Sequence, residues 1–271
     1  MWLLPEVLEK PLRRKKPTTY FVNSLADWAH ESIVGSEQGR RFLAAMFGVM
    51  AATPQHTYQL LTKRPELARK WFEWLGTVDA GRIITGRHAA FVVRDAMMEQ
   101  LGSSLDDRLY MRLKFNMHCD AWPLPNVWLG CSVEDQPTAD ERIPALLKLP
   151  AAVRFLSAEP LLGPIDLGQS VPPEFLGLSR VTKMAFGSRA SAPMSIDWVI
   201  VGGESGPKAR QCDVGWIRSI VEQRRAAGAP VFCKQLGARP VHDGVPYALQ
   251  DAKGGDMSEW PEDLRVREMP G

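Results

Sequence analysis

Residues 197–206, Asp-Trp-Val-Ile-Val-Gly-Gly-Glu-Ser-Gly, decide the fold, because here a short apolar run ends abruptly in glycines and a carboxylate. The chain repeats this arrangement elsewhere, and each apolar run before polar residues predicts a strand. The predicted strands are 18–24, 57–62, 127–133, 152–157, 197–201 and 230–234. Buried parallel strands with polar residues at their C-terminal ends are how βα-barrels and open α/β sheets build an active site. The pattern therefore predicts an α/β fold with one functional edge.

The segments between the strands predict helices and two insertions. Ser36 is a good N-cap, Pro65 suits a first helical turn, and further helices are expected after Pro137 and Asp213. We expect a lead-in that is not a folded unit, a single βα-barrel domain, two insertions within it (the first carrying helical pattern) and a loop-like C-terminal tail. Their ranges are 1–17, 18–236, about 77–122 and 163–195, and 237–271. Periodicity alone does not separate a barrel from an open doubly wound sheet.

Composition describes an ordinary globular protein. The chain has 271 residues, is 45% hydrophobic and carries a formal charge of +2, so its overall charge does not favour nucleic acid. No apolar stretch is long enough for a membrane span or a signal peptide, so we expect no membrane partner. Four cysteines without a Cys-x-x-Cys pair predict reduced thiols and a cytoplasmic location.

Charged residues at the strand ends are the candidate site. Lys63 and Arg64 lie where a strand meets a helix and would suit an anion. The alternative is that both are solvated surface cations, and we favour the anion contact because both lie at the predicted active edge. Ser132 and Ser157 are each followed, two residues on, by a glutamate: Glu134 and Glu159. These acids suit general acid–base work, binding of a substrate amine, or pairing with Lys63, Arg64 or Lys234. A purely structural ion-pair network explains them equally well.

Gly202, Gly203, Glu204 and Ser205 form the sharpest local motif. Glycines after a buried strand allow a ligand to approach the backbone, and the glutamate suits a ribose hydroxyl or an amino group, so we expect cofactor binding here. The motif lacks both the dinucleotide-binding spacing and the P-loop lysine. The full set expected to line the cavity adds Asn23, Asp27, Lys63, Arg64, Ser132, Glu134, Ser157, Glu159 and Lys234.

Five blocks of this sequence, in order and spacing, resemble one family. They are 21–27, 55–65, 126–136, 155–164 and 197–207. Together they are similar to the phage gp-thirty-seven/sixty-eight-like family of uncharacterised proteins from phages, prophages and bacteria, whose members look like radical S-adenosylmethionine (radical SAM) barrels. The resemblance implies a TIM-like barrel, a possible S-adenosylmethionine site, and an iron–sulfur cluster held by three cysteines in the full-length family form.

This chain departs from the family where the cluster cysteines would stand. Its first residues resemble the segment downstream of them, which implies a truncated barrel lacking its first strand, inactive as written, with an exposed edge along 18–24. Whether the chain is an enzyme is left open, as are the substrate, the oligomeric state and the role of the 77–122 insertion. The alternative is a non-catalytic phage protein that binds a nucleotide or nucleic acid, supported by the cations at 13–16 and 63–64.

Overall fold

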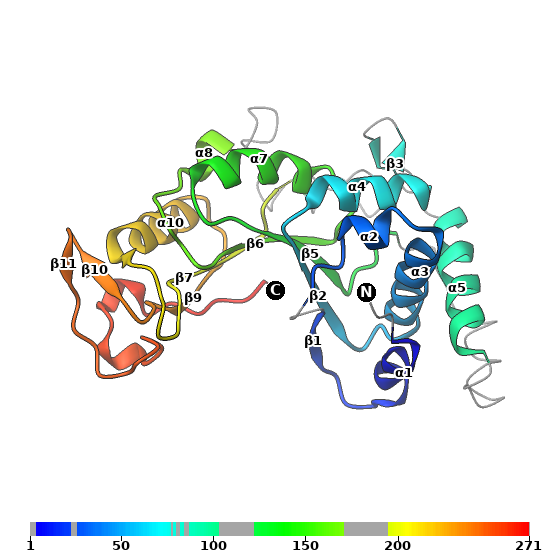
Figure 1. Cartoon of the computed structure of the whole chain (residues 1–271), viewed down its shortest axis with the longest axis horizontal. Coiled ribbons are helices and arrows are strands. Elements are labelled where there is room, and N and C mark those ends of the chain that lie inside the picture. Colours follow the sequence, from blue (N-terminus) through cyan, green and yellow to red (C-terminus); the bar gives the residue numbers. More distant parts are fainter. Residues whose placement is uncertain are drawn as a thin grey trace. The chain divides into compact units, whose positions relative to one another are not determined.

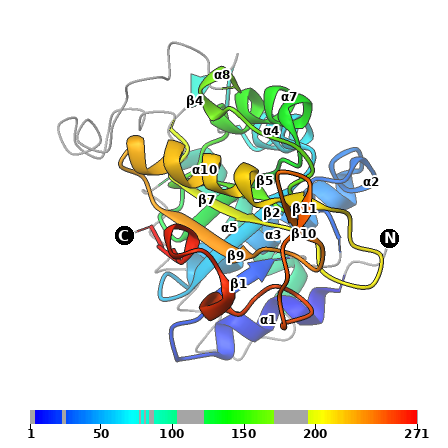
Figure 2. The same cartoon turned by 90° about the vertical axis from the view of Figure 1, so that its left-hand side faces the viewer.

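The structure, a computed structural model, describes residues 4–22, 26–76, 78–79, 82–83, 87–102, 122–170 and 195–270. The chain forms two compact units. Unit 1 comprises 1–129 with 148–152, and unit 2 comprises 130–147 with 153–271. We expected a single domain over 18–236, and that expectation stays a prediction. Figures 1 and 2 show the elements of both units.

The principal sheet has six strands in the order β1-β2-β5-β6-β7-β9. All are parallel, and each matches a predicted strand within a residue or two. Their bounds are Thr19–Val22, Thr57–Thr62, Val127–Ser132, Val153–Ala158, Trp198–Gly202 and Val231–Gln235. Among the six strands of this sheet, each lies beside the one that precedes it in the sequence, whereas the strand order of a doubly wound sheet reverses at a switch point. The order is that of a partial βα-barrel, and the predicted α/β class is confirmed.

Among its described residues, unit 1 contains β1, β2, the start of β5 and five helices. The helices are α1 (Pro5–Arg13), α2 (Glu31–Val34), α3 (Glu37–Ala52), α4 (Pro65–Trp74) and α5 (Arg87–Leu101), with the short strands β3 (Val78–Asp79) and β4 (Arg82–Ile83). Ser36 caps α3 as predicted, because its hydroxyl accepts the Gly39 N–H at 3.1 Å. Helices α3 and α5 lie side by side (Figure 1). A Cβ at Gly48 would lie 2.3 Å from the Val93 carbonyl oxygen, so this glycine permits their close packing.

Aromatic side chains fill the core of unit 1. Trp28, Phe47, Trp71 and Phe72 are all buried, and the ring centroids of Phe47 and Trp71 are 4.7 Å apart. Aromatic pairs at such distances contribute beyond their buried area. Helix α5 lies in the expected insertion at 77–122 and confirms its helical character, while residues 103–121 lie outside the described part of the chain.

The start of the chain differs from expectation. Residues 1–17 were expected to be an unfolded lead-in, but α1 occupies 5–13 and buries Leu8 and Leu12. The imidazole Nε2 of His56 lies 3.1 Å from the carbonyl oxygens of both Pro11 and Arg14, which ties the end of the helix to the start of β2. Leu8 and Leu12 are four residues apart and therefore share one helix face. The proline and charge content of the segment concealed this spacing.

Unit 2 contains the rest of β5, then β6, β7, β9 and their helices. These are α7 (Gln136–Leu147), α8 (Leu167–Ser170) and α10 (Val214–Ala226). Helix α10 begins as predicted, because the Asp213 carboxylate accepts the Gly215 N–H at 2.8 Å. It ends before Gly228, whose φ of +61° is readily adopted only by glycine. Helix α10 packs against β7 and β9 (Figure 2). Of the expected 163–195 insertion, residues 171–194 lie outside the described residues.

The segment after β9 was expected to be a loop-like tail, and the structure corrects this. It forms β10 (Pro240–His242), which pairs with β11 (Val245–Pro246) and with β8 (Cys212–Asp213), followed by short 3-10 helices at Met257–Glu259 and Glu262–Leu264. Its end runs antiparallel along β9: Cys233 donates its N–H to Val266 O at 2.9 Å, and Glu268 donates to Val231 O at 3.0 Å. Trp260 is only 1% exposed. One edge of the sheet is thus covered by the chain itself.

The opposite end of the sheet order is β1, which pairs with β2. Its Phe21 side chain is 48% exposed. The expected exposed edge along 18–24 therefore falls on the terminal strand of the sheet, with residues 23–25 outside the described part.

Candidate functional site

The C-terminal ends of β5, β6, β7 and β9 meet along one edge of unit 2. Main-chain hydrogen bonds join the segments that leave these strands: Leu161 N–H donates to Gly202 O at 2.9 Å, Leu162 N–H to Glu134 O at 2.7 Å, and Gly203 N–H to Gln235 O at 3.1 Å. The acids predicted after β5, β6 and β7 therefore share one edge with Lys234 of β9, as expected for parallel strands.

Glu159 follows β6 and has a different hydrogen-bonding arrangement from the neighbouring acids Glu134 and Glu204. Its side chain is 13% exposed, and Oε2 accepts a hydrogen bond from Lys234 Nζ at 3.2 Å. Oε1 is buried and has no hydrogen-bond partner within the described structure. Burial raises the pKa of Glu159, and the nearby Lys234 ammonium offsets part of that effect. Burying a hydrogen-bond acceptor without a partner costs free energy. The Glu159 carboxyl is therefore stabilised by taking up a proton or by a ligand that donates a hydrogen bond to Oε1.

The glycines after β7 are explained by backbone packing. A Cβ at Gly203 would lie 2.2 Å from Leu236 O, and one at Gly202 would lie 2.8 Å from Gln235 O and 2.9 Å from Glu159 Oε1. Both positions lie against the chain leaving β9, and Gln235 Nε2 also donates to Gly203 O at 2.8 Å. The glycines therefore permit the close approach of two protein segments, and their predicted role in cofactor binding stays a prediction.

Glu204 has a partner that the sequence analysis missed. Its Oε2 accepts from Arg210 Nε and from the Arg210 backbone N–H, both at 2.8 Å, and its Oε1 accepts from Arg210 Nη2 at 3.0 Å. These hydrogen bonds lower the pKa of Glu204 to about 2. The carboxylate closes the loop 204–210, and Ser205 within it is exposed. The six-residue spacing of the pair carries no helix or strand period, which is why pattern alone did not reveal it.

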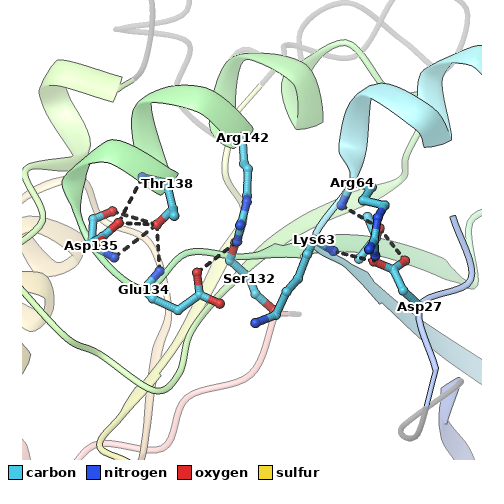
Figure 3. A network of polar contacts seen from close by, with 9 residues as sticks. Asp27, Lys63, Arg64, Ser132, Glu134, Asp135, Thr138 and Arg142 are labelled. Atoms are coloured by element: carbon cyan, nitrogen blue, oxygen red, sulfur yellow. Dashed lines mark hydrogen bonds and ion pairs between the residues drawn. The ribbon is translucent and has the colours of Figure 1, made fainter. Parts of the chain in front are cut away.

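Glu134 also pairs with an arginine of its own unit. Arg142, on α7, donates through Nη1 to Glu134 Oε2 at 2.9 Å and to Ser132 O at 2.8 Å (Figure 3). Glu134 also acts on Arg210, whose pKa is raised mainly by Glu204 and in smaller part by Glu134. The arginines that partner these acids lie on α7 and in the loop after β7, so the site depends on more than strand ends.

The start of α7 is organised by a separate set of hydrogen bonds (Figure 3). The Thr138 hydroxyl donates to Asp135 Oδ1 at 2.7 Å and accepts the Glu134 N–H at 2.9 Å. The hydrogen bonds from Thr138 lower the pKa of Asp135. Ser132 and Ser157 are both buried at their strand ends, where Ser157 O accepts the Val133 N–H at 3.0 Å. This network holds the segment that carries Glu134.

In unit 1 the Arg64 guanidinium and the Lys63 backbone contact the Asp27 carboxylate (Figure 3). Asp27 Oδ2 accepts from the Lys63 N–H at 3.0 Å and from Arg64 Nη1 at 2.9 Å. Its Oδ1 accepts from the Thr62 hydroxyl at 2.6 Å and from the Ala29 N–H at 3.0 Å. A carboxylate of the chain itself thus pairs with Arg64 at the start of α4, and the binding of an external anion by Lys63 and Arg64 stays a prediction. That these residues share a cavity with Glu159 stays a prediction, and Asn23 lies outside the described residues.

The cysteines that the structure describes do not fit an iron–sulfur cluster. Such a cluster needs thiolates grouped around iron. Cys131, Cys212 and Cys233 are buried, and burial raises the pKa of each thiol to about 12. No group of three or more His, Cys, Asp or Glu side chains in the described residues could hold a metal ion. Cys119 lies outside those residues.

None of the helices that the structure describes is long and apolar enough to cross a membrane. The cations that supported nucleic-acid binding are partly engaged within the chain, since Arg13 pairs with Glu9 and Arg64 with Asp27.

Comparison with known proteins places the chain in a family without supplying a function. No curated protein and no solved structure matches it. One family model, described as a protein of unknown function (DUF5131), matches residues 1–260. The match covers the whole parallel sheet and every acid of the candidate site. The chain therefore belongs to the DUF5131 family of proteins of unknown function.

Proposed function

We propose that the chain binds a small molecule at the C-terminal ends of the unit 2 strands and that Glu159 is the group there that gives or takes a proton. One observation carries the proposal: a carboxyl at a parallel strand end has one oxygen on Lys234 and the other buried without a partner among the described residues. Strand ends of this kind are where barrel enzymes place their reacting groups.

The contrast between neighbouring acids supports this role. Burial raises the pKa of Glu159, whereas Arg210 lowers the pKa of Glu204 to about 2. Carboxyls whose surroundings push their pKa values apart are typical of sites that divide acid and base roles. Glu204 and Glu134 already have arginine partners, so they suit a supporting role beside Glu159.

We further propose that the ligand is S-adenosylmethionine and that the barrel is of the radical-SAM or TIM type. These finer proposals, together with a phage or prophage origin, rest on the sequence resemblance. The Glu159 carboxylate suits the amino group of that cofactor. The buried, reduced cysteines that the structure describes support a cytoplasmic location.

Calorimetric titration with S-adenosylmethionine tests the cofactor proposal. We expect the wild-type protein to bind and Glu159→Gln to weaken binding at least about tenfold, the effect of losing one charge-assisted hydrogen bond. Glu141→Gln, which changes an exposed acid on α7, is the matched control and should bind like wild type. Absence of wild-type binding would exclude this cofactor.

The broader proposal has its own test. Thermal-shift screening of wild type and Glu159→Gln against nucleosides, amino acids and sulfonium compounds should find compounds that stabilise wild type more than the variant. A screen in which every stabilising compound acts equally on both proteins contradicts the role of Glu159.

A further inference from the structure

We infer that Lys234 controls whether Glu159 carries a proton, and that an anionic ligand group which draws Lys234 away makes Glu159 take up one proton. This inference rests on the proposed function, because it concerns the same carboxyl. It adds a ligand class, an anion, and a consequence of binding that is measurable without knowing the reaction.

The geometry leaves Glu159 dependent on one cation. Lys234 Nζ lies 3.2 Å from Oε2, and Oε1 is buried with no hydrogen-bond partner in the described residues. Gly202, at the end of β7, has no side chain that could contact Glu159. A Cβ atom added at Gly202 would lie 2.9 Å from Glu159 Oε1. Removing Lys234 would leave a carboxylate charge buried without compensation, which costs more than taking up a proton.

Lys234 is placed to exchange partners. Its side chain is 57% exposed, whereas that of Glu159 is 13% exposed. The Lys234 ammonium has three N–H donors at the end of a flexible side chain. Because that side chain is exposed, solutes can reach the ammonium from the solvent. A phosphate or carboxylate group that binds Lys234 Nζ competes with the Glu159 carboxylate for the same ammonium group. Glu159 then takes its proton from hydronium in the solvent: one O–H bond of the hydronium breaks as the carboxyl O–H bond forms, and a water molecule is left.

Few other titratable groups act on this carboxyl. From β9, Glu159 also has a small electrostatic effect on the Cys233 thiol, but burial raises the pKa of Cys233 to about 12, so the thiol stays neutral near pH 7. From β7, Gly202 contributes no charge. The ammonium of Lys234 lowers the pKa of Glu159 against the opposing effect of burial. Lys234 is thus the charged side chain whose movement changes the state of Glu159.

Infrared spectroscopy of protein labelled with carbon-13 glutamate tests the inference, because a protonated carboxyl has its own C=O band. Glu159→Gln assigns the band by removing it. We expect the pH midpoint of that band to rise in Lys234→Met by at least about one unit, since the buried carboxylate loses its partner. Lys234→Arg, which keeps the charge, should titrate close to wild type. Equal midpoints in wild type and Lys234→Met overturn the inference.

The ligand half is tested with inorganic phosphate. Added phosphate should raise the midpoint of wild type and leave that of Lys234→Met unchanged; an unchanged wild-type midpoint overturns the anion exchange. Because Lys234 is exposed, these variants should fold, and circular dichroism verifies this. The experiment uses no organic ligand, so a failure of the small-molecule screen and a failure of the Lys234 inference are separate results.

Discussion

Three glutamates at one edge of unit 2 differ through their partners. Arg210 contacts both oxygens of Glu204, Arg142 contacts Glu134, and Lys234 contacts one oxygen of Glu159. A bidentate guanidinium holds a carboxylate more firmly than a single ammonium does. The chemistry of each acid is therefore set by the cation that the fold brings to it.

Replacing Glu159 should change how stability depends on pH. Its pKa in the folded protein is raised above the ordinary 4.5, so the folded state binds the proton more tightly than the unfolded state. Stability is then lost as pH rises from the ordinary value through the folded value. Glu159→Gln removes this loss, so its stability relative to wild type should increase with pH in urea unfolding. Glu141→Gln should follow the wild-type curve, and a parallel course for Glu159→Gln would contradict the prediction.

Gly203→Ala tests whether the glycine pair serves packing. The added methyl group would meet the backbone at Leu236, which cannot move as a side chain can, so we expect a loss of about 3 kcal/mol in the free energy of unfolding. Gly163→Ala is the control, because its Cβ would lie 3.5 Å from the nearest atom, an ordinary contact. Denaturant unfolding measures both. Equal stability of the two variants would reopen a ligand role for Gly203.

At the scale of elements, Asp27 joins the segment after β1 to the start of α4. Arg64, at the N-cap, makes no side-chain capping bond, and the Asp27 carboxylate lies at this helix end instead. An acid near a helix N-terminus is favourable because backbone N–H groups point towards it. The Arg64 guanidinium and the Lys63 backbone thus have a structural partner inside unit 1.

Asp27→Asn should destabilise the protein by about 2 kcal/mol, since the amide places a donor where Asp27 accepts hydrogen bonds from charged and backbone groups. Asp95→Asn is the comparison, because Asp95 pairs with Arg94 while its side chain is 63% exposed. Exposed pairs contribute little, so this change should stay below about 1 kcal/mol. Thermal unfolding of the two variants measures the difference, and similar melting points would contradict the role of Asp27.

The elements that were predicted correctly are those specified by residues close together in the sequence. Six apolar runs predicted six strands, and Ser36 and Asp213 marked two helix starts correctly. Helix α1 was missed because its two buried leucines are scattered among prolines and charges. The C-terminal segment was missed because its contacts with β7 and β9 join residues more than 30 positions apart.

At the scale of the whole molecule, the two ends of the sheet order differ. β9 is covered by the chain's own C-terminal segment, and Arg267 lies over the rings of Phe232 and Trp260 at 5.5 and 5.4 Å. Covering an edge strand prevents its unpaired backbone groups from pairing with another chain. The segment that was expected to be a tail therefore protects the fold.

Removing residues 257–271 should destabilise the protein by about 4 kcal/mol or more, because it deletes the buried Trp260 and the segment that runs along β9. The uncovered edge should also cause concentration-dependent aggregation, measured by light scattering. Removing residues 269–271 is the control, since Arg267 and Glu268 remain and Met269 is exposed. A soluble and stable longer deletion would show that the segment is dispensable.

The sequence by itself determined the parallel strands, their order along the chain and the acids at their ends, because apolar runs and abrupt polar endings are local properties. Only the tertiary structure decided which cation faces which acid, that the glycines after β7 accommodate the chain leaving β9, and that β9 is covered. Those outcomes depend on residues distant in sequence meeting at distances of about 3 Å, which no local pattern encodes.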